Sequence, residues 1–281
     1  MTKVYKPGIG LKKALAGESG RFVPHLEKWM SNREPEFRDY SYLHPSSIIK
    51  DDWCQREAWF QLSGHKAIIK PLAFSTANMF NEGHLIHSKW QKYFAEMGVL
   101  YGSWTSPGSD RKWNGYGAVT DTYHEVPLSL PDLMIKGRAD GWIKGIGKDA
   151  LIEIKSVGIG SVRWEASHLL TSYGNDIDKI WAGIKAPFPS HIRQGQLYLH
   201  IANLMVERGT LKSAPQEIVY IYEWKPSQLV KEFVVEYFPA ASNRFIQRAK
   251  TVVDALGGEP LECSHGDSCS ACASYKLETL P

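Results

Sequence analysis

The sequence predicts a mixed α/β fold in which helices flank a central sheet. Three observations support this: segments with apolar residues three and four apart, runs rich in β-branched and aromatic residues, and their order along the chain. That order is helix, helix, strands, helix, strands, helix, which is typical of a sheet covered by helices. A chain of 281 residues can bury a sizeable core, and we expect an arm or short helical lead-in at 1–44 followed by one large domain at 45–281.

Four segments have helical spacing between recognisable start and stop signals. We expect helices at 48–63, 76–97, 190–208 and 242–256. Serines are favoured before a helix and glycines after it, and both occur here. The expected caps and stops are Ser46 or Ser47, Ser190 and Ser242, and Gly64, Gly98 and Gly209. The second helix carries an apolar stripe that predicts its buried side: Met79, Ile86, Trp90, Tyr93 and Met97.

Strands are predicted in two pairs. The expected strands are 133–144, 150–156, 217–224 and 233–238, of which the first two form a hairpin. Residues 101–124 are rich in Gly, Ser and Trp and predict a loop or an irregular hairpin. The polar residues 157–189 predict an insertion or a mobile lid.

Composition excludes some classes of protein and leaves others open. A formal net charge of +3 is too small to identify a partner. No stretch approaches the roughly 20 apolar residues of a membrane span, so we expect no membrane partner. The first residues lack the apolar core of a secretory signal, which favours a cytoplasmic location.

The hairpin carries the most informative side chains of the chain. Asp140 lies on its first strand, and Glu153 and Lys155 point the same way from its second. Two converging carboxylates repel each other, and the usual relief is a proton or a divalent cation. Oxygen ligands suit Mg²⁺ or Mn²⁺, and a neighbouring lysine can orient water or stabilise charge on a phosphate. The hairpin therefore predicts a metal-dependent phosphodiesterase, although Glu-x-Lys on a strand is more often a solvated face.

Three further polar residues have both a structural and a functional interpretation. His87 borders the apolar stripe, where a histidine is more often a satisfied core residue than a ligand. Gln194 and Tyr198 lie one helical turn apart, so their polar ends can reach one surface. Taken alone, that pair is better explained by an ordinary amphipathic helix with a tyrosine at its rim.

The four cysteines predict a metal site. Cys54 stands alone, whereas Cys263, Cys269 and Cys272 cluster near the end of the chain. Four thiolates can hold an iron–sulfur cluster or a tetrahedral zinc, and His265 could replace one of them at zinc. Reduced thiols without a metal are the remaining alternative.

Taken together, these motifs resemble the RecB-like branch of the PD-(D/E)XK nuclease superfamily, and in particular the CRISPR-associated RecB-like iron–sulfur exonucleases and their phage-encoded relatives. The resemblance spans about residues 46–272. It rests on Cys54-Gln55-Arg56, Gly83-x3-His87, Gly137-x2-Asp140, Glu153-Ile154-Lys155, Gln194-x3-Tyr198 and the terminal cysteines. Two positions depart from the family pattern: Ala139 stands where proline is usual, and the cysteine triplet has its long spacing first.

The resemblance implies a restriction-endonuclease-like core and a role for each motif. His87, Asp140, Glu153 and the backbone carbonyl of Ile154 would bind Mg²⁺ or Mn²⁺, and Lys155 would orient the attacking water. Gln194 and Tyr198 would position DNA or the active-site lysine. The four cysteines would hold a 4Fe-4S cluster that ties the C-terminal tail to the first core helix.

The implied activity is that of a DNA nuclease, with an exonuclease on single strands or ends more expected than an endonuclease. Recombination, repair or CRISPR adaptation proteins would be its partners, in a host cytoplasm if the chain is phage-encoded. Two other hypotheses remain at this point: a non-catalytic DNA-binding adaptor with the same fold, and a zinc-stapled structural protein.

Overall fold

The computed structural model describes residues 22–32, 39–65, 73–101, 125–266, 269–273 and 275. The chain divides into two compact units, one of residues 1–38 and 69–81 and one of residues 39–68 and 82–281. The described part of the first unit holds helix α2 (Val23–Ser31) and the start of α5 (Phe74–Glu96). Nearly all of the loop predicted at 101–124 lies outside the described residues.

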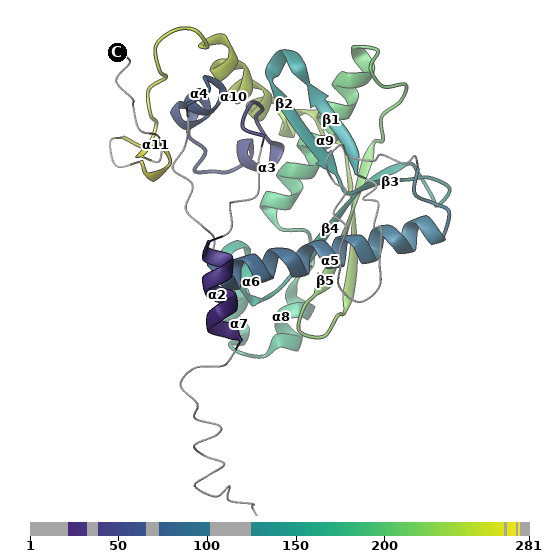
Figure 1. The fold of residues 1–281 in the computed structure, drawn as a ribbon. Helices are drawn as coiled ribbons and strands as arrows, with labels where there is room; N and C mark the ends of the chain where they lie inside the picture. Colours follow the sequence, from purple (N-terminus) through teal and green to yellow (C-terminus); the bar gives the residue numbers. More distant parts are fainter. Residues whose placement is uncertain are drawn as a thin grey trace, which may run out of the picture. The chain divides into compact units, whose positions relative to one another are not determined.

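The second unit is built on a mixed four-stranded sheet, as predicted (Figure 1). Its strands, in spatial order, are β3 (Gly141–Ile143), β4 (Ala150–Val157), β5 (Glu217–Trp224) and β6 (Val230–Glu236). The central pair β4–β5 is parallel and both outer pairs are antiparallel. A separate antiparallel pair joins β1 (Val126–Leu130) to β2 (Ile135–Ala139).

The first predicted strand, 133–144, is wrong as one element. It is divided at Asp140 into β2 and β3, which belong to different sheets. The Asp140 carbonyl accepts a hydrogen bond from the Gln91 side chain at 2.8 Å instead of joining a strand ladder. Strand β1 has no counterpart in the sequence prediction, because Pro127 in so short a segment conceals its β character.

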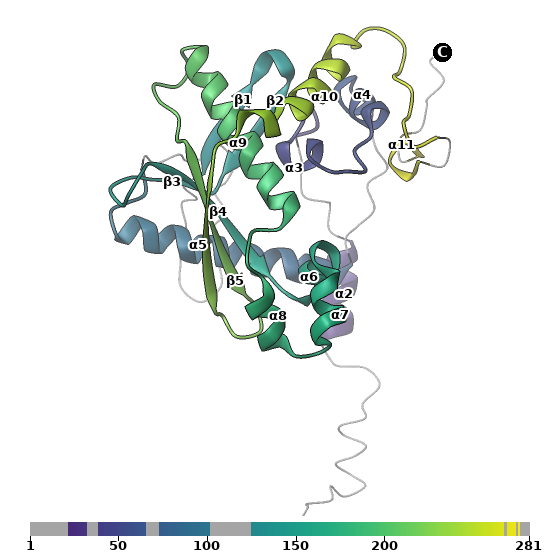
Figure 2. The same ribbon diagram turned by 180° about the vertical axis from the view of Figure 1, so that it is seen from behind.

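Helices cover both faces of the four-stranded sheet. Figure 1 shows α5 in front of the sheet. Figure 2, seen from behind, shows α9 (Pro189–Glu207) in front of it. On the α5 side, Ile152 and Ile154 of β4 pack in one apolar cluster with Ile86. Figure 2 shows α9 running across β4 and β5, where its contacts include Gly195 packed against β5.

Gly195 explains how closely α9 approaches β5. A Cβ atom at this position would lie 2.0 Å from the Tyr220 hydroxyl and 2.8 Å from Ile218. Any larger residue would therefore push the helix away from the strand. On the same helix, Gln194 contacts Lys155 of β4 and the Tyr198 ring lies against Gly137 of β2.

The helix predicted at 48–63 is wrong as one element. Only its second half is helical, as α4 (Gln55–Leu62), and its first residue ends a separate short helix, α3 (Pro45–Ile48), with a turn between the two. The sulfur of Cys54 caps α4 by accepting the Glu57 N–H at 3.5 Å, so the helix starts at the cysteine rather than at a serine. The predicted buried stripe is only partly correct, because Ile86 is buried whereas Met79 and Tyr93 of α5, and Met97 just after it, are exposed.

The remaining predicted helices are present with changed ends. Helix α9 begins without a side-chain cap, since the Ser190 hydroxyl donates to Glu165 at 2.5 Å instead. Helix α10 (Asn243–Asp254) follows Ser242, which also provides no side-chain cap bond. The polar residues 157–189 form three short helices: α6 (Ile159–Glu165), α7 (Ser167–Tyr173) and α8 (Ile177–Gly183). Among the described residues, no helix is both long and apolar enough to cross a membrane.

Candidate active site

Asp140 lies at the break between β2 and β3, where its carboxylate is held from two sides. One oxygen accepts the Ile154 N–H at 2.6 Å, and the other lies 3.2 Å from Nδ1 of His87. Burial alone would raise the pKa of Asp140, but His87 and the hydrogen bonds outweigh it and lower that pKa. Burial alone would lower the pKa of His87, but the neighbouring carboxylate of Asp140 outweighs it and raises that pKa.

Glu153 is a buried carboxylate in the centre of β4. Its Oε1 lies 2.6 Å from the Lys155 ammonium, whereas its Oε2 is buried and has no hydrogen-bond partner among the described residues. Burial, reinforced by the nearby charge of Asp140 and opposed by Lys155, raises the pKa of Glu153 to about 7. A carboxylate oxygen left without a partner in the core is costly unless a ligand binds it.

Lys155 continues this network into α9. Its ammonium also donates to Oε1 of Gln194 at 3.2 Å, and the Gln194 amide donates to the Tyr198 hydroxyl at 2.9 Å. Burial would lower the pKa of Lys155, but the carboxylates of Glu153 and Asp140 raise it. Four residues from two separate motifs therefore form one hydrogen-bonded chain: Glu153, Lys155, Gln194 and Tyr198.

The register of the parallel strands adds residues that the sequence analysis missed. Tyr222 of β5 is paired with Lys155, and Tyr220 is paired with Glu153. The Tyr222 hydroxyl contacts Nδ1 of His191 on α9, and the Tyr220 hydroxyl donates to the His191 carbonyl at 3.0 Å. The spacing of His191 three residues before Gln194 is visible in the sequence, but its contact with β5 is not.

A third buried carboxylate, that of Glu223, fastens α5 to the sheet. Its two oxygens accept hydrogen bonds from Lys89 at 2.6 Å and from the Trp90 indole at 2.7 Å. Both donors lie within one turn of His87 on α5. Glu223 therefore fixes the part of α5 that presents His87 to Asp140, and both of its oxygens have partners, unlike those of Glu153.

The acidic residues suit a divalent cation in their chemistry, although their ligand atoms are not drawn tightly together. Among the described residues, only the four cysteines form a group whose ligand atoms all lie within 4.8 Å of one another. His87 and Asp140 contact each other, while Glu153 is turned towards Lys155. The partnerless oxygen of Glu153 is the observation that fits a bound cation, since carboxylate oxygen is the donor that Mg²⁺ and Mn²⁺ prefer.

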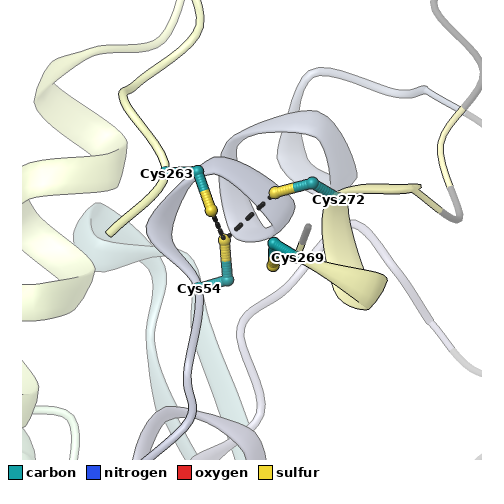
Figure 3. Close-up of side chains that lie close together, drawn as sticks. All are labelled: Cys54, Cys263, Cys269 and Cys272. Carbon is teal, nitrogen blue, oxygen red and sulfur yellow. Dashed lines mark hydrogen bonds between the residues drawn. The ribbon is translucent and has the colours of Figure 1, made fainter. Parts of the chain in front are cut away.

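The four cysteines converge as predicted (Figure 3). The sulfur of Cys54 lies 3.2 Å from that of Cys272 and 3.6 Å from that of Cys263. Two thiolates bound at about 2.3 Å to one tetrahedral ion stand about 3.8 Å apart, which is close to this spacing. A 4Fe-4S cubane binds each thiolate to a different iron and needs the sulfurs further apart, so the donor set suits both groups and the spacing suits a single ion better.

Hydrogen bonds to sulfur favour the thiolate form of Cys263 and Cys269. The His265 N–H donates to Cys263 at 3.4 Å and lowers the pKa of Cys263 to about 7. Nδ1 of His265 also lies 3.7 Å from the Cys269 sulfur. Thiolates are the form that binds metals. Burial instead raises the pKa of Cys54 and Cys272, so a metal that bound here would have to displace the protons of those two thiols.

Side chains of α4 hold the tail beside the cysteines. Gln55 and Arg56 donate to the carbonyls of Glu262 and Leu261 at 2.9 and 2.8 Å, and the Trp59 indole donates to the Ala255 carbonyl at 3.0 Å. The motif that begins at Cys54 thus provides a sulfur ligand and two anchors for the same segment. The cysteine cluster links the C-terminal tail to the core of the fold.

Comparison with known proteins gives only distant likenesses. No family model and no curated protein matches the sequence. The crystal structure of SSO0001 is 15% identical, over 86% of this chain and 90% of that one, with a TM-score of 0.36. Two crystal structures of LHK-Exo, an alkaline exonuclease from Laribacter hongkongensis, one in complex with dAMP, are 14% identical over 81% of this chain and 91% of theirs, with TM-scores of 0.41 and 0.43. The function is therefore argued from the residues of the site itself.

Proposed function

We propose that this chain is a divalent-metal-dependent nuclease that hydrolyses phosphodiester bonds in DNA. The observation that carries the proposal is the partnerless buried oxygen of Glu153, set between Asp140 and Lys155. Burying three ionisable side chains together contributes little to stability, and pKa values shifted in this way are typical of catalytic sites.

Each residue then has a defined role. Asp140, Glu153, His87 and the Ile154 carbonyl would hold Mg²⁺ or Mn²⁺, which when bound polarises the scissile phosphate and acidifies a water. Lys155 places a positive charge where negative charge develops on the phosphate. Gln194 and Tyr198 keep the lysine in position through the hydrogen-bonded chain described above.

The finer assignments follow from the resemblance of the motifs. They are membership of the RecB-like branch of the PD-(D/E)XK superfamily and exonuclease action on single strands or DNA ends. They extend to a cytoplasmic setting in recombination, repair or CRISPR-type processing. The cysteine site, in the same proposal, binds a structural metal that fastens residues 263–275 to α4. The donor set fits a 4Fe-4S cluster or zinc, and the sulfur spacing favours zinc.

The test is digestion of end-labelled single- and double-stranded DNA by the purified full chain with Mg²⁺, with Mn²⁺ or with EDTA. We expect cleavage only with a divalent ion. If the enzyme acts from the labelled end, the first labelled product should be a short fragment released from that end. Wild-type protein that degrades neither substrate with either ion would overturn the proposal. Protein that binds DNA tightly without cleaving it would identify the adaptor instead.

A further inference from the structure

We propose that His191 donates a hydrogen bond from Nε2 to a phosphate oxygen of the nucleic-acid substrate, beside Lys155. The proposal rests on the proposed function in one respect only, namely that the ligand is a phosphodiester. His191 would be a substrate-binding residue in the same site, and none of the sequence motifs includes it.

The position of His191 follows from two independent alignments. On α9, His191, Gln194 and Tyr198 are spaced by three and four residues, which places them on one face of the helix. On the sheet, Tyr222 and Lys155 are register partners on adjacent parallel strands. Gln194 contacts Lys155 and His191 contacts Tyr222, so the two pairs lie side by side.

The hydrogen-bond pattern at Tyr222 determines which ring nitrogen of His191 carries its proton. The Tyr222 hydroxyl is buried, and its oxygen accepts the Phe188 N–H at 2.7 Å. Its only other partner among the described residues is Nδ1 of His191. A buried hydroxyl that donated to nothing would be unsatisfied, so it donates to Nδ1, and a neutral ring then carries its hydrogen on Nε2.

The ring is neutral and its donor is open to a ligand. Burial, together with the nearby ammonium of Lys155, lowers the pKa of His191 well below its usual value. His191 is half-buried, and its Nε2 is not among the buried polar atoms without partners, so this atom reaches solvent. A neutral hydrogen-bond donor next to Lys155 suits a phosphodiester oxygen, because its directional hydrogen bond supplements the attraction of the lysine's positive charge.

A purely structural role, in which His191 only locks Tyr222 to α9, makes a different prediction, and two substitutions separate the two roles. His191→Asn keeps an acceptor near the position of Nδ1 but has no group at Nε2. His191→Gln places an amide donor near Nε2 but loses the acceptor for Tyr222. The ligand-binding role and the structural role are therefore removed one at a time.

The experiment measures the dissociation constant of a fluorescent single-stranded oligonucleotide with EDTA present, and the Tm of each variant of the full chain. We expect His191→Asn to weaken binding by about tenfold at nearly unchanged Tm, since a hydrogen bond to a charged group is lost. We expect His191→Gln to bind within about twofold of wild type and to melt at a lower temperature.

The inference would be overturned if His191→Asn bound the oligonucleotide as tightly as wild type, or if His191→Gln were the only variant with weaker binding. Wild-type protein that binds no oligonucleotide would overturn it too. The assay contains no metal and no cleavage step, so its outcome is independent of nuclease activity. If the protein fails to cleave DNA but the two variants bind and melt as expected, the nuclease proposal is wrong and the inference about His191 still holds. Long-range ¹H–¹⁵N spectra of the free protein give a direct check, because they show whether Nε2 of His191 carries the hydrogen.

Discussion

The carboxylate of Asp140 accepts the main-chain N–H of Ile154 at 2.6 Å, across the hairpin that joins β3 to β4. This bond connects the two halves of the most informative motif, because it fixes Asp140 directly beside the strand that carries Glu153 and Lys155. The same carboxylate contacts His87 on α5 with its other oxygen. Asp140 therefore has a structural partner and a candidate catalytic partner at the same time.

Substitution of Asp140 separates these two functions. Asp140→Asn retains an oxygen for the Ile154 N–H but loses the charge, so we expect cleavage to fall by at least about 100-fold with little change in stability. Asp140→Ala also leaves a buried N–H without an acceptor, and should lower the free energy of unfolding by about 1–3 kcal/mol. Nuclease assays and denaturant unfolding measure the two effects, and equal activity of Asp140→Asn and wild type would contradict the catalytic role.

Lys155 should be needed for cleavage and not for folding. We expect Lys155→Ala, and Lys155→Met with its longer uncharged side chain, to abolish measurable DNA cleavage. The reason is that, within the described part of the chain, no other positive charge is hydrogen-bonded to Glu153. The matched control is Lys148→Ala, which removes an exposed lysine from the turn of the same hairpin. Loss of activity in the control as well, or activity in both Lys155 variants, would remove Lys155 from the mechanism.

Apart from the cysteine cluster, the parts of the site that the sequence predicts are those whose residues lie close together along one element. Glu153 and Lys155 are two residues apart on a strand, and Gln194 and Tyr198 are one turn apart on a helix, so strand and helix periodicity places each pair on one face. The convergence of four cysteines was also predictable, because few other arrangements satisfy an isolated pair of thiols spaced by two residues.

The parts that the sequence did not predict depend on contacts between distant segments. Glu223 meets Lys89 across 134 positions of the chain, and Tyr222 meets His191 across 31. Neither contact leaves a periodic signal. The division of the helix predicted at 48–63 has the same origin, since Cys54 is drawn out of helical geometry towards Cys263 and Cys272 by tertiary contacts that local propensity does not contain.

The raised pKa of Glu153 predicts how metal binding and stability change with pH. In the folded protein this pKa is about 7, above the value of 4.5 of an unperturbed glutamate. The stabilising contribution of its protonated form is therefore complete below about pH 4.5 and is lost as the pH rises through 7. A cation must displace that proton, so we expect Mn²⁺ to raise the Tm clearly at pH 8, by about 3 °C or more, and much less at pH 5.5.

Glu153→Gln provides the control for this pH effect. The amide neither titrates nor carries the charge that attracts a cation, so the Mn²⁺-dependent rise in Tm should be small at both pH values. Differential scanning fluorimetry with and without Mn²⁺ measures all four conditions. A Tm rise in the variant that matches that of wild type would show that the ion binds elsewhere.

The cysteine site should contribute stability through a bound metal. Cys54 and Cys272 lie 218 positions apart, so a metal between them closes a loop that includes most of the chain. We expect Cys54→Ser and Cys272→Ser to lose the metal and to lower the Tm by about 5 °C or more. His265→Ala should retain the metal, because the four thiolates complete a ligand set without it.

Metal and sulfide analysis of anaerobically purified protein identifies the bound species. One zinc per chain without acid-labile sulfide is the result that the sulfur spacing favours, and it should disappear from Cys54→Ser while remaining in His265→Ala. Four irons and four sulfides per chain would instead establish the cluster that the motif resemblance implies, and would require the sulfurs of Cys54 and Cys272 to separate well beyond 3.2 Å when it binds. A metal at this site would be contradicted if wild-type protein contained neither zinc nor iron and melted at the same temperature as both serine variants. The hydrogen bonds of Gln55, Arg56 and Trp59 would then hold the tail without a metal.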